Sequence, residues 1–389
     1  MRKIHKVTAS RPLRILVLGL EGPVTGGAYT AENLMLEQIR EAAGKHEIFL
    51  MRDLLNQSRL PQFFYEKICK IEKILAITLS SPLFYRLSLK LKRGWKTLLQ
   101  KNLDKLSVDL VIFVGIYDDA ILLNGTPYFV TIWDIGHREL TFLPEMSRNA
   151  TFEWREWVIT HLAKKATGVF VESNVTKENL VTLYGIREHN IHILPFVPTF
   201  TDKLPPASRE DFVFYPAHFW SHKNHSVLLK AMHYLINQGV SPRRLVLTGL
   251  DRGSKKHFLN VAEELGLLGF IDDKGFLKDA EIKALYRSAA VTAMPSVLGP
   301  TNLPPLESLL EGCPVVVSAS GNFDVKGLVG SQSLDPYDFQ AWSVVFDKRV
   351  PLPKVSVKSI RNRMLHGREH NLLQIKLILE DFHVKRELY

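Results

Sequence analysis

The chain has 389 residues, 46% of them hydrophobic and 23% charged, and a formal net charge of +10 at pH 7. This length exceeds what one hydrophobic core usually organises and so predicts two domains. The two cysteines are far apart, which argues against a disulfide framework or a thiolate metal site, and no apolar run approaches the ~18 residues of a membrane-spanning helix. We therefore expect a cytoplasmic protein whose positive charge favours an anionic partner without identifying it.

Short β-branched and apolar segments predict buried parallel strands in the first half of the chain. These segments are LRILVLGL (13–20), VDLVIFVGI (108–116), PYFVTIWDI (127–135) and TGVFVES (167–173). Helical patterns lie between them; after Gly27, apolar residues recur at Ala31, Met35 and Ile39. Alternation of this kind predicts βαβ units and an α/β fold.

A proline-rich stretch, residues 194–210, separates this series from a second one, because proline at this density disfavours both helix and central strand. The strands predicted after it are FVFYPAH (212–218), RRLVLTGL (243–250), AAVTAMPS (289–296) and PVVVSAS (314–320). The domains we predict are residues 1–198, residues 199–350 and a basic helical tail of residues 351–389. Ligands of open parallel sheets bind at the carboxyl ends of the strands, so functional residues should follow strands and face a cleft between the domains.

The first candidate site is the turn GLEGPVTGG (19–27), which follows a predicted strand and precedes a helix. Gly26 and Gly27 would let the backbone approach an anionic ligand at the N-terminus of that helix. The turn lacks a complete GxGxxG pattern, so a tight connection that binds no ligand is the alternative.

The second candidate site is the segment YPAHFWSHKNHS (215–226), in which Lys223 precedes a helix that Asn224 or Ser226 can cap. A lysine at a helix N-terminus is electrostatically unfavourable by itself, and a bound phosphate would remove the conflict. A solvated loop lysine is the alternative.

The third candidate site is the segment PSVLGPTNLPPLESLLEGCP (295–314), where Thr301 or Asn302 can cap a short helix. The backbone amides of Asn302 and Leu303 could bind an anion, and Glu307 could accept hydrogen bonds from both hydroxyls of a ribose. Phosphate and ribose together describe a nucleotide. For Glu307, the alternative is an acidic residue that only stabilises the start of the helix.

Together these segments resemble the retaining glycosyltransferases of family 4, in a subgroup with a GPTN loop. The resemblance covers most of the chain and is strongest from Phe212 to Asp338; it also includes WDIGHRELTFLPEMS (133–147) and VFVESNVTKENLVTLYGIREHNIHILPF (169–196). It implies the GT-B fold, in which two Rossmann-like domains with parallel sheets face a central cleft, with a C-terminal tail that returns to the first domain. The implied activity is transfer of a hexose from a nucleotide-diphosphate donor to a glycan or lipid-linked saccharide, in polysaccharide or cell-envelope synthesis.

By this resemblance, Lys223 binds the donor diphosphate, Glu307 binds the ribose, and Lys223 and His137 are the catalytic residues. The other donor-binding positions carried over are Gly27 near the transferred sugar, His218 near the phosphate, Gly249 and Phe276 beside the base, and Thr301, Asn302 and Leu303 in the loop. A histidine that serves only the fold is the alternative for His137.

Three positions depart from the pattern of the family. Gly299 stands where the family has the first of two glutamates, His218 stands where many members have arginine or glutamine, and Trp133 replaces a frequent histidine. The first departure leaves inactivity open, the second weakens the positive charge around the phosphate, and the third leaves His137 as the candidate.

The expected mechanism follows from the negative charge that builds on the departing diphosphate, which fixed donors would stabilise. Lys223 and the amides of the loop would supply these donors. No acidic pair is placed to hold a divalent metal, so we expect catalysis without a metal or a cofactor. In retaining members of the family the leaving phosphate is thought to accept the proton of the acceptor, so no separate carboxylate base is needed.

Residues 61–105 are helical in pattern and basic, with aromatic residues between the charges, as in segments that lie on anionic membranes. A solvated helix with its aromatic residues in the core is the alternative. We expect peripheral association with the inner membrane face and no nucleic-acid partner, because no nucleic-acid-binding module is recognisable. The rival functions are a nucleotide-sugar epimerase or phosphorylase on the same fold, and an inactive nucleotide-sugar-binding protein.

Overall fold

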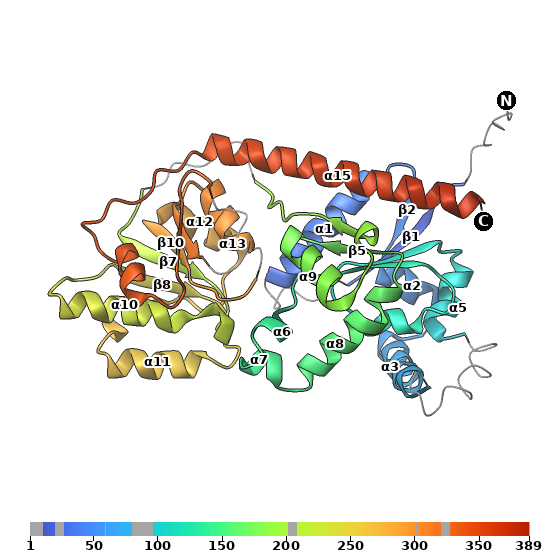
Figure 1. Cartoon of the computed structure of the whole chain (residues 1–389), viewed down its shortest axis with the longest axis horizontal. Coiled ribbons are helices and arrows are strands. Elements are labelled where there is room, and N and C mark those ends of the chain that lie inside the picture. The colour runs from blue at the N-terminus through green and yellow to red at the C-terminus, as the bar shows by residue number, and fades with distance from the viewer. Residues whose placement is uncertain are drawn as a thin grey trace.

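Two parallel sheets organise the protein, one in each half of the chain (Figure 1). The computed structural model describes residues 11–19, 27–58, 60–79, 96–200, 208–299, 302–319 and 327–388. Each sheet has six strands, in the orders β2-β1-β3-β4-β5-β6 and β12-β11-β10-β7-β8-β9. The predicted α/β fold with two parallel sheets is confirmed.

The first sheet has helices on both faces. Its strands are β1 (Arg14–Leu18), β2 (Glu47–Phe49), β3 (Leu110–Phe113), β4 (Tyr128–Thr131), β5 (Gly168–Val171) and β6 (Ile191–Ile193). Helices α1 (Gly27–Ala43) and α15 (Val357–Leu388) pack on one face, and α5 (Leu98–Lys105), α8 (Thr151–His161) and α9 (Asn174–Tyr184) pack on the other. The two faces form separate apolar clusters, so the strands between them are buried on both sides.

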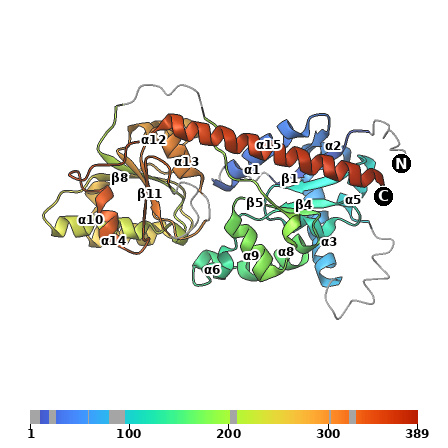
Figure 2. The ribbon, with the colours of Figure 1, turned by 45° about the horizontal axis from the view of Figure 1, so that its top comes forward.

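Shorter elements surround this sheet. They are α2 (Met51–Ser58), α3 (Gln62–Leu79), η3 (Asp118–Leu122), α6 (Gly136–Glu139), α7 (Pro144–Ser147), η4 (Ala163–Lys165) and η5 (Glu188–Asn190). Helices α6 and α7 follow strand β4, at the carboxyl end of the sheet. This position brings them to the boundary with the second domain (Figures 1 and 2).

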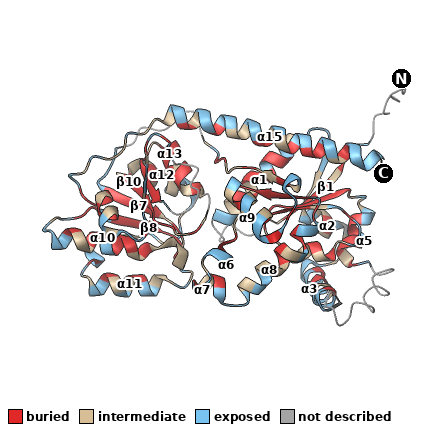
Figure 3. Ribbon diagram, in the orientation of Figure 1, coloured by how far each residue is buried: buried red, intermediate tan, exposed pale blue. Residues whose placement is uncertain are grey.

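The second sheet is built in the same way. Its strands are β7 (Phe212–Pro216), β8 (Arg244–Thr248), β9 (Ile271–Asp273), β10 (Val291–Met294), β11 (Val315–Ser318) and β12 (Ser331–Leu334). Its helical elements are η6 (Ser221–Lys223), α10 (His225–Asn237), α11 (Lys255–Glu264), η7 (Leu268–Phe270), α12 (Asp279–Ser288), α13 (Leu303–Leu310), α14 (Phe339–Trp342) and η8 (Ser343–Val345). Helices α10 and α11 cover one face, and α12 packs on the other against Phe212, Phe214 and Val246. The buried residues lie in and beside the two sheets (Figure 3).

Helix α15 runs along both domains (Figures 1 and 2). Near its start, Ile360 and Met364 join the core of the second domain, and further on Ile375 and Leu379 join the core of the first. The chain therefore connects its two halves twice, through residues 194–211 and through α15. Across the described residues, no helix combines the length and the apolar character needed to cross a bilayer.

Candidate functional site

Lys223 lies at the domain boundary and has a neutral partner. It ends the 3-10 helix η6 after strand β7, and its Nζ donates a hydrogen bond of 3.0 Å to Oδ1 of Asn302, just before α13. The described residues give it no carboxylate in ion-pair contact. Burial lowers the pKa of Lys223 to about 8, and the carboxylate of Asp134, in the first domain, opposes this shift. A desolvated cation without a counterion beside a helix N-terminus is suited to bind an anion.

Asn302, at the start of α13, bonds to Lys223 and does not cap the helix. Asn302 occupies the N-cap position, but its side chain makes no capping hydrogen bond; its Nδ2 donates instead to the carbonyl of Gly299 at 3.3 Å. The capping role considered for Asn302 is therefore wrong. Pro304 and Pro305 carry no N–H group, so they leave the amide of Leu303 as a donor in the first turn. Thr301 lies outside the described residues.

Glu307 lies one turn inside α13, and the pKa of its carboxyl group differs from that of an exposed glutamate. Its Oε2 accepts a hydrogen bond of 3.1 Å from the hydroxyl of Tyr286. Burial raises the pKa of Glu307 to about 7, although the hydrogen bond from Tyr286 opposes the rise. The carboxyl group is therefore close to half ionised at neutral pH, and a ligand with donor hydroxyls would favour the ionised form.

His218, in the loop after β7, presents a defined donor. Its Nδ1 accepts a hydrogen bond of 2.9 Å from the backbone N–H of Leu250, so in the neutral ring Nε2 carries the proton. Burial lowers the pKa of this ring, and the charges of Arg252 and Lys223 lower it further, so it stays neutral. Nε2 is buried and finds no hydrogen-bond partner among the described residues. His218 therefore offers one N–H donor in place of a positive charge.

The loops after β7, β8 and β9 contact one another at the position of Gly249. A Cβ on Gly249 would lie 2.4 Å from the carbonyl oxygen of Ala217, and the N–H of Gly249 donates to the carbonyl of Gly275 at 2.8 Å. Only glycine allows this approach. Phe276, 49% exposed, follows in the third loop, so the two residues predicted to border a base lie in adjoining loops.

The first domain brings a second helix N-terminus to the boundary. Gly27 begins α1 and is exposed, and an added Cβ there would meet no atom of the described residues within 4 Å. One turn later, Ala31 and Leu34 pack against Leu303 at the start of α13. The N-terminal turns of α1 and α13 therefore adjoin across the boundary.

His137 is directed into the interior of the first domain. Its side chain is fully buried in α6, and Nε2 lies 2.8 Å from Oε1 of Glu156 and 3.1 Å from the hydroxyl of Tyr184. Burial lowers its pKa, and Arg155 lowers it further. With these partners, the histidine serves the packing of α6 against α8 and α9, which favours the structural alternative for this residue.

Three residues near Lys223 were not among the predicted site residues. Asp134 is buried against Arg155, whose Nη2 donates to its Oδ1 at 2.6 Å. Glu145 of α7 and His222 of η6 form a contact between the domains. The sequence offered a signal for two of them: Asp134 lies near the end of the predicted strand 127–135, and His222 directly precedes Lys223.

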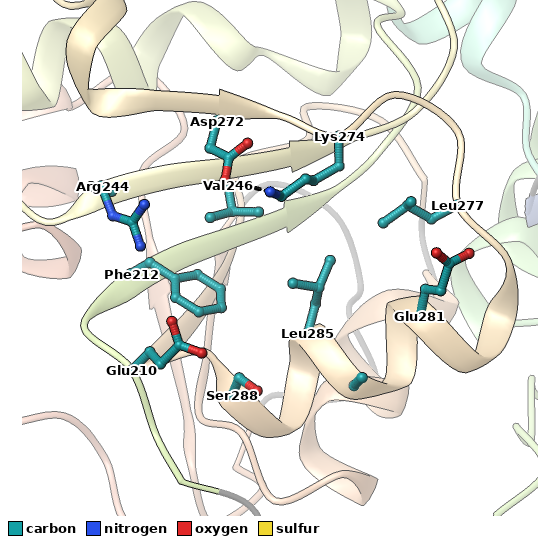
Figure 4. A pocket seen from close by; sticks show the side chains of 11 residues that line it. Glu210, Phe212, Arg244, Val246, Asp272, Lys274, Leu277, Glu281, Leu285 and Ser288 are labelled. Carbon is teal, nitrogen blue, oxygen red and sulfur yellow. Dashed lines mark ion pairs between the residues drawn. The ribbon is translucent and has the colours of Figure 1, made fainter.

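A separate hollow of about 490 Å³ lies on the second domain, between α12 and strands β7 to β9 (Figure 4). The side chains that line it include Glu210, Phe212, Arg244, Asp272, Lys274 and Glu281. Asp272 and Lys274 pair with each other at 2.8 Å. None of the predicted site residues lines this hollow. In the described part of the chain, no group of three or more His, Cys, Asp or Glu side chains is arranged to hold a metal ion.

Comparison with known proteins identifies the fold. Residues 197–325 match the model of a family described as Glycosyl transferases group 1. No curated protein has significant sequence similarity to the chain.

Several solved structures share its architecture at low sequence identity. Sucrose-phosphate synthase from Thermosynechococcus elongatus is 16% identical, with a TM-score of 0.57 over 97% of this chain and 99% of that chain. The lipopolysaccharide outer core galactosyltransferase WaaB is 15% identical, with a TM-score of 0.55 over 93% and 99%. Anabaena HepE in complex with UDP and glucose is 15% identical, with a TM-score of 0.54 over 95% of each chain. The chain thus has the GT-B fold of two Rossmann-like domains, and its second half resembles group 1 glycosyltransferases.

Proposed function

We propose that the protein is a retaining glycosyltransferase of family 4, in the GPTN-loop subgroup, that transfers a hexose from a nucleotide-diphosphate donor to a glycan or lipid-linked acceptor. The observation that carries the proposal is the position of Lys223. It is a desolvated cation with a neutral partner, Asn302, at the N-terminus of α13. A diphosphate at this position would supply the missing negative charge.

The rest of the donor would occupy the residues around Lys223. Glu307 would accept hydrogen bonds from the ribose, and the Nε2–H group of His218 would donate to a phosphate oxygen. Gly249 and Phe276 would border the base, and Gly27 would adjoin the sugar. Because HepE has been solved with UDP and with UDP-glucose, we expect UDP as the nucleotide.

The chemistry we propose is stabilisation of the leaving group. As the bond between sugar and phosphate breaks, negative charge grows on the diphosphate, and the ammonium group of Lys223 and the Leu303 amide would stabilise it. The departing phosphate oxygen would take the proton of the acceptor hydroxyl on the same face of the sugar, which retains the anomeric configuration. The buried, hydrogen-bonded His137 has no step in this scheme.

The first experiment measures binding and turnover of the donor. We expect UDP to raise the melting temperature of the protein, because a ligand that binds only the native state stabilises it. UDP-glucose, tested first, should lose its sugar slowly to water and faster to an acceptor, with an α-configured product by NMR. Conversion of the donor into an isomeric nucleotide sugar without an acceptor would favour the epimerase. Tight binding with no product from water or from any tested acceptor would favour the inactive binding protein.

Independence from metals stays a prediction of this proposal. If Lys223 and α13 do what a divalent cation does in other sites, turnover should be unchanged in excess EDTA. Loss of turnover in EDTA and its recovery with Mg²⁺ would contradict this part of the proposal.

Helix α3 supports a further proposal, that the protein works in the cytoplasm at an anionic membrane. The helix contacts the domain through the buried residues Tyr65, Cys69 and Ala76 and through Glu72 and Lys73, which bond to Leu98 and to Asp118 and Asp119. Its exposed apolar residues are Phe63, Phe64, Ile68, Ile71, Ile74, Leu75 and Ile77. Lys67 and Lys70 are exposed among them. Apolar side chains beside cations suit an interface of anionic lipid. Residues 80–95 of the predicted basic segment lie outside the described residues.

Vesicle flotation tests this surface. The protein should float with vesicles that contain phosphatidylglycerol and not with pure phosphatidylcholine vesicles. The double substitution Phe64→Ser and Ile71→Ser should abolish flotation, whereas Leu373→Ser with Leu377→Ser, which alters exposed leucines of α15, should not. Dimerisation that depends on Phe64 and Ile71, without any binding to vesicles, would instead identify the surface as an interface between two copies.

A further inference from the structure

The two domains contact each other through a carboxylate and a histidine next to the candidate site. Oε1 of Glu145, in α7 of the first domain, accepts two hydrogen bonds from His222 of the second domain. One comes from the backbone N–H and one from ring Nδ1, and both measure 2.8 Å. The two side chains are only 8% and 15% exposed. An ionised carboxylate only accepts hydrogen bonds, so Nδ1 of His222 carries a proton.

His222 also contacts residues 296–297, which follow strand β10 and lead into the loop before α13 (the donor loop). Its carbonyl oxygen accepts hydrogen bonds from the backbone N–H of Val297 at 2.8 Å and from Oγ of Ser296 at 3.3 Å. Two residues after Val297 the chain reaches Gly299, whose carbonyl accepts from Asn302. His222 is therefore bonded on one side to the first domain and on the other side to the segment that carries the loop.

Lys223 is the next residue along the chain, so its backbone position depends on His222. Its Nζ donates to Asn302. Contacts therefore connect Glu145, through His222, to Lys223 and to the loop that carries Asn302, the two parts of the proposed diphosphate site. Charged hydrogen bonds of this length, protected from water, hold their partners in defined geometry.

Apolar packing strengthens the same contact. Leu298, 7% exposed, packs against Leu143 and Met146 of the first domain. It also approaches Gly136 so closely that an added Cβ there would lie 2.6 Å from both of its methyl groups. The α6–α7 segment therefore fits against residues 222 and 297–298 in this arrangement of the domains.

We infer that Glu145 is a positioning residue for the proposed reaction: by binding His222 it fixes Lys223 and the donor loop, so the diphosphate site is complete only when the first domain is docked. This inference rests on the proposed function. It assigns Glu145 no contact with the donor, because its carboxylate would repel a diphosphate and is occupied by His222.

The effect of Glu145 should therefore be transmitted by Lys223. Glu145→Ala should weaken binding of UDP and of inorganic pyrophosphate by about tenfold to a hundredfold, as expected for loss of hydrogen bonds to a charged group. Glu145→Gln, whose amide oxygen still accepts both hydrogen bonds, should restore most of the affinity. The matched control is Glu153→Ala, which removes an exposed carboxylate of α8 and should leave binding unchanged.

A double-mutant cycle separates positioning from general damage. In the Lys223→Ala background, Glu145→Ala should change pyrophosphate binding by less than about threefold, because the group through which it acts is gone. Equal losses in both backgrounds, or binding by Glu145→Ala equal to that of the unchanged protein, would overturn the inference. Melting temperatures of all variants exclude unfolding as the cause of a loss.

Hydrogen exchange distinguishes failure of this inference from failure of the proposed function. Glu145→Ala should speed exchange of the Val297 amide, which His222 protects, in the absence of any nucleotide. If the unchanged protein bound neither UDP nor pyrophosphate, the proposed function would fail. Exchange at Val297 unaffected by Glu145→Ala would independently show that Glu145 does not fix this segment.

Discussion

Lys223 lies in an environment that disfavours its protonated, positively charged form. Burial lowers its pKa to about 8, so above that pH the free protein carries a neutral amine at the proposed diphosphate position. A diphosphate binds the protonated form, and affinity should therefore fall as pH rises through 8. The same ammonium group is needed in the transition state, so its loss should also slow transfer.

We predict that UDP-glucose, whose diphosphate does not titrate in this range, binds about tenfold more weakly at pH 9 than at pH 7. Lys223→Ala should bind it about a hundredfold more weakly at pH 7, with no further loss up to pH 9. Isothermal titration calorimetry measures both. If the alkaline loss persisted in Lys223→Ala, another group would be responsible.

Glu307 should determine how the affinity for UDP-glucose changes below pH 7. Burial raises its pKa to about 7, so the carboxylate gains a proton as pH falls through 7 and loses an acceptor for the ribose. We predict that UDP-glucose affinity falls by about three- to fivefold from pH 7 to pH 6. In Glu307→Gln this acid loss should disappear, while affinity at pH 8 is about tenfold lower. A profile of Glu307→Gln that still declined below pH 7 would remove Glu307 from the ribose site.

At the scale of elements, the loop before α13 has a backbone that favours glycine at position 299. The φ of Gly299 is +105°, which favours glycine, and an added Cβ would lie 2.8 Å from Nδ2 of Asn302. A larger residue would displace Asn302 and with it the partner of Lys223. Glycine at this position therefore allows Asn302 to remain beside Lys223.

We predict that Gly299→Ala lowers UDP affinity by more than about tenfold, because both the backbone and Asn302 must shift. The matched control is Gly253→Ala: Gly253 has nearly the same φ, +104°, but no atom of the described part of the chain lies within 4 Å of its added Cβ. The control should lose stability in thermal melts to a similar extent and keep its affinity for UDP. Equal affinities of the two variants would show that contact with Asn302 is unimportant.

The sequence predicted the inner strands of both sheets and missed the outer ones. All eight predicted strands lie inside a sheet, where burial on both faces requires continuous apolar runs, as in the fully buried β3 and β5. The four missed strands, β2, β6, β9 and β12, are the edges. They are three or four residues long and partly exposed, so polar residues interrupt them and the apolar pattern disappears.

Part of the candidate site was predictable, because residues that follow the strands of a parallel sheet meet at one edge of that sheet. Lys223, Glu307 and His218 follow strands or begin helices, and the topology then brings them near one another. His137 shows what sequence position does not predict. The sequence of the four-residue helix α6 does not indicate whether this side chain faces the domain boundary or the interior, and in the structure it points toward Glu156. The contact between Glu145 and His222 joins residues 77 positions apart in different domains, and no local pattern indicates it.

At the scale of the whole molecule, three kinds of contact join the domains near the site. Helix α15 spans both cores, Leu303 packs against α1, and the α6–α7 segment meets residues 222 and 297–298. The last of these consists of two hydrogen bonds and a small apolar cluster, so its loss would leave the domains connected through α15. Opening and closing at this segment would let the donor enter and would then complete its site.

Gly136 offers the means to test closure without touching the donor site. An alanine there would place a methyl group 2.6 Å from both methyl carbons of Leu298, so the docked arrangement must shift; within the first domain it would also lie 3.1 Å from Oδ1 of Asp134, a looser contact. We predict that Gly136→Ala weakens UDP binding several-fold and speeds hydrogen exchange in α7 in the presence of UDP. Gly125→Ala should do neither, because this glycine of the same domain has no described atom within 4 Å of the new Cβ. Unchanged exchange and affinity in Gly136→Ala would mean that UDP binds without docking of the α6–α7 segment.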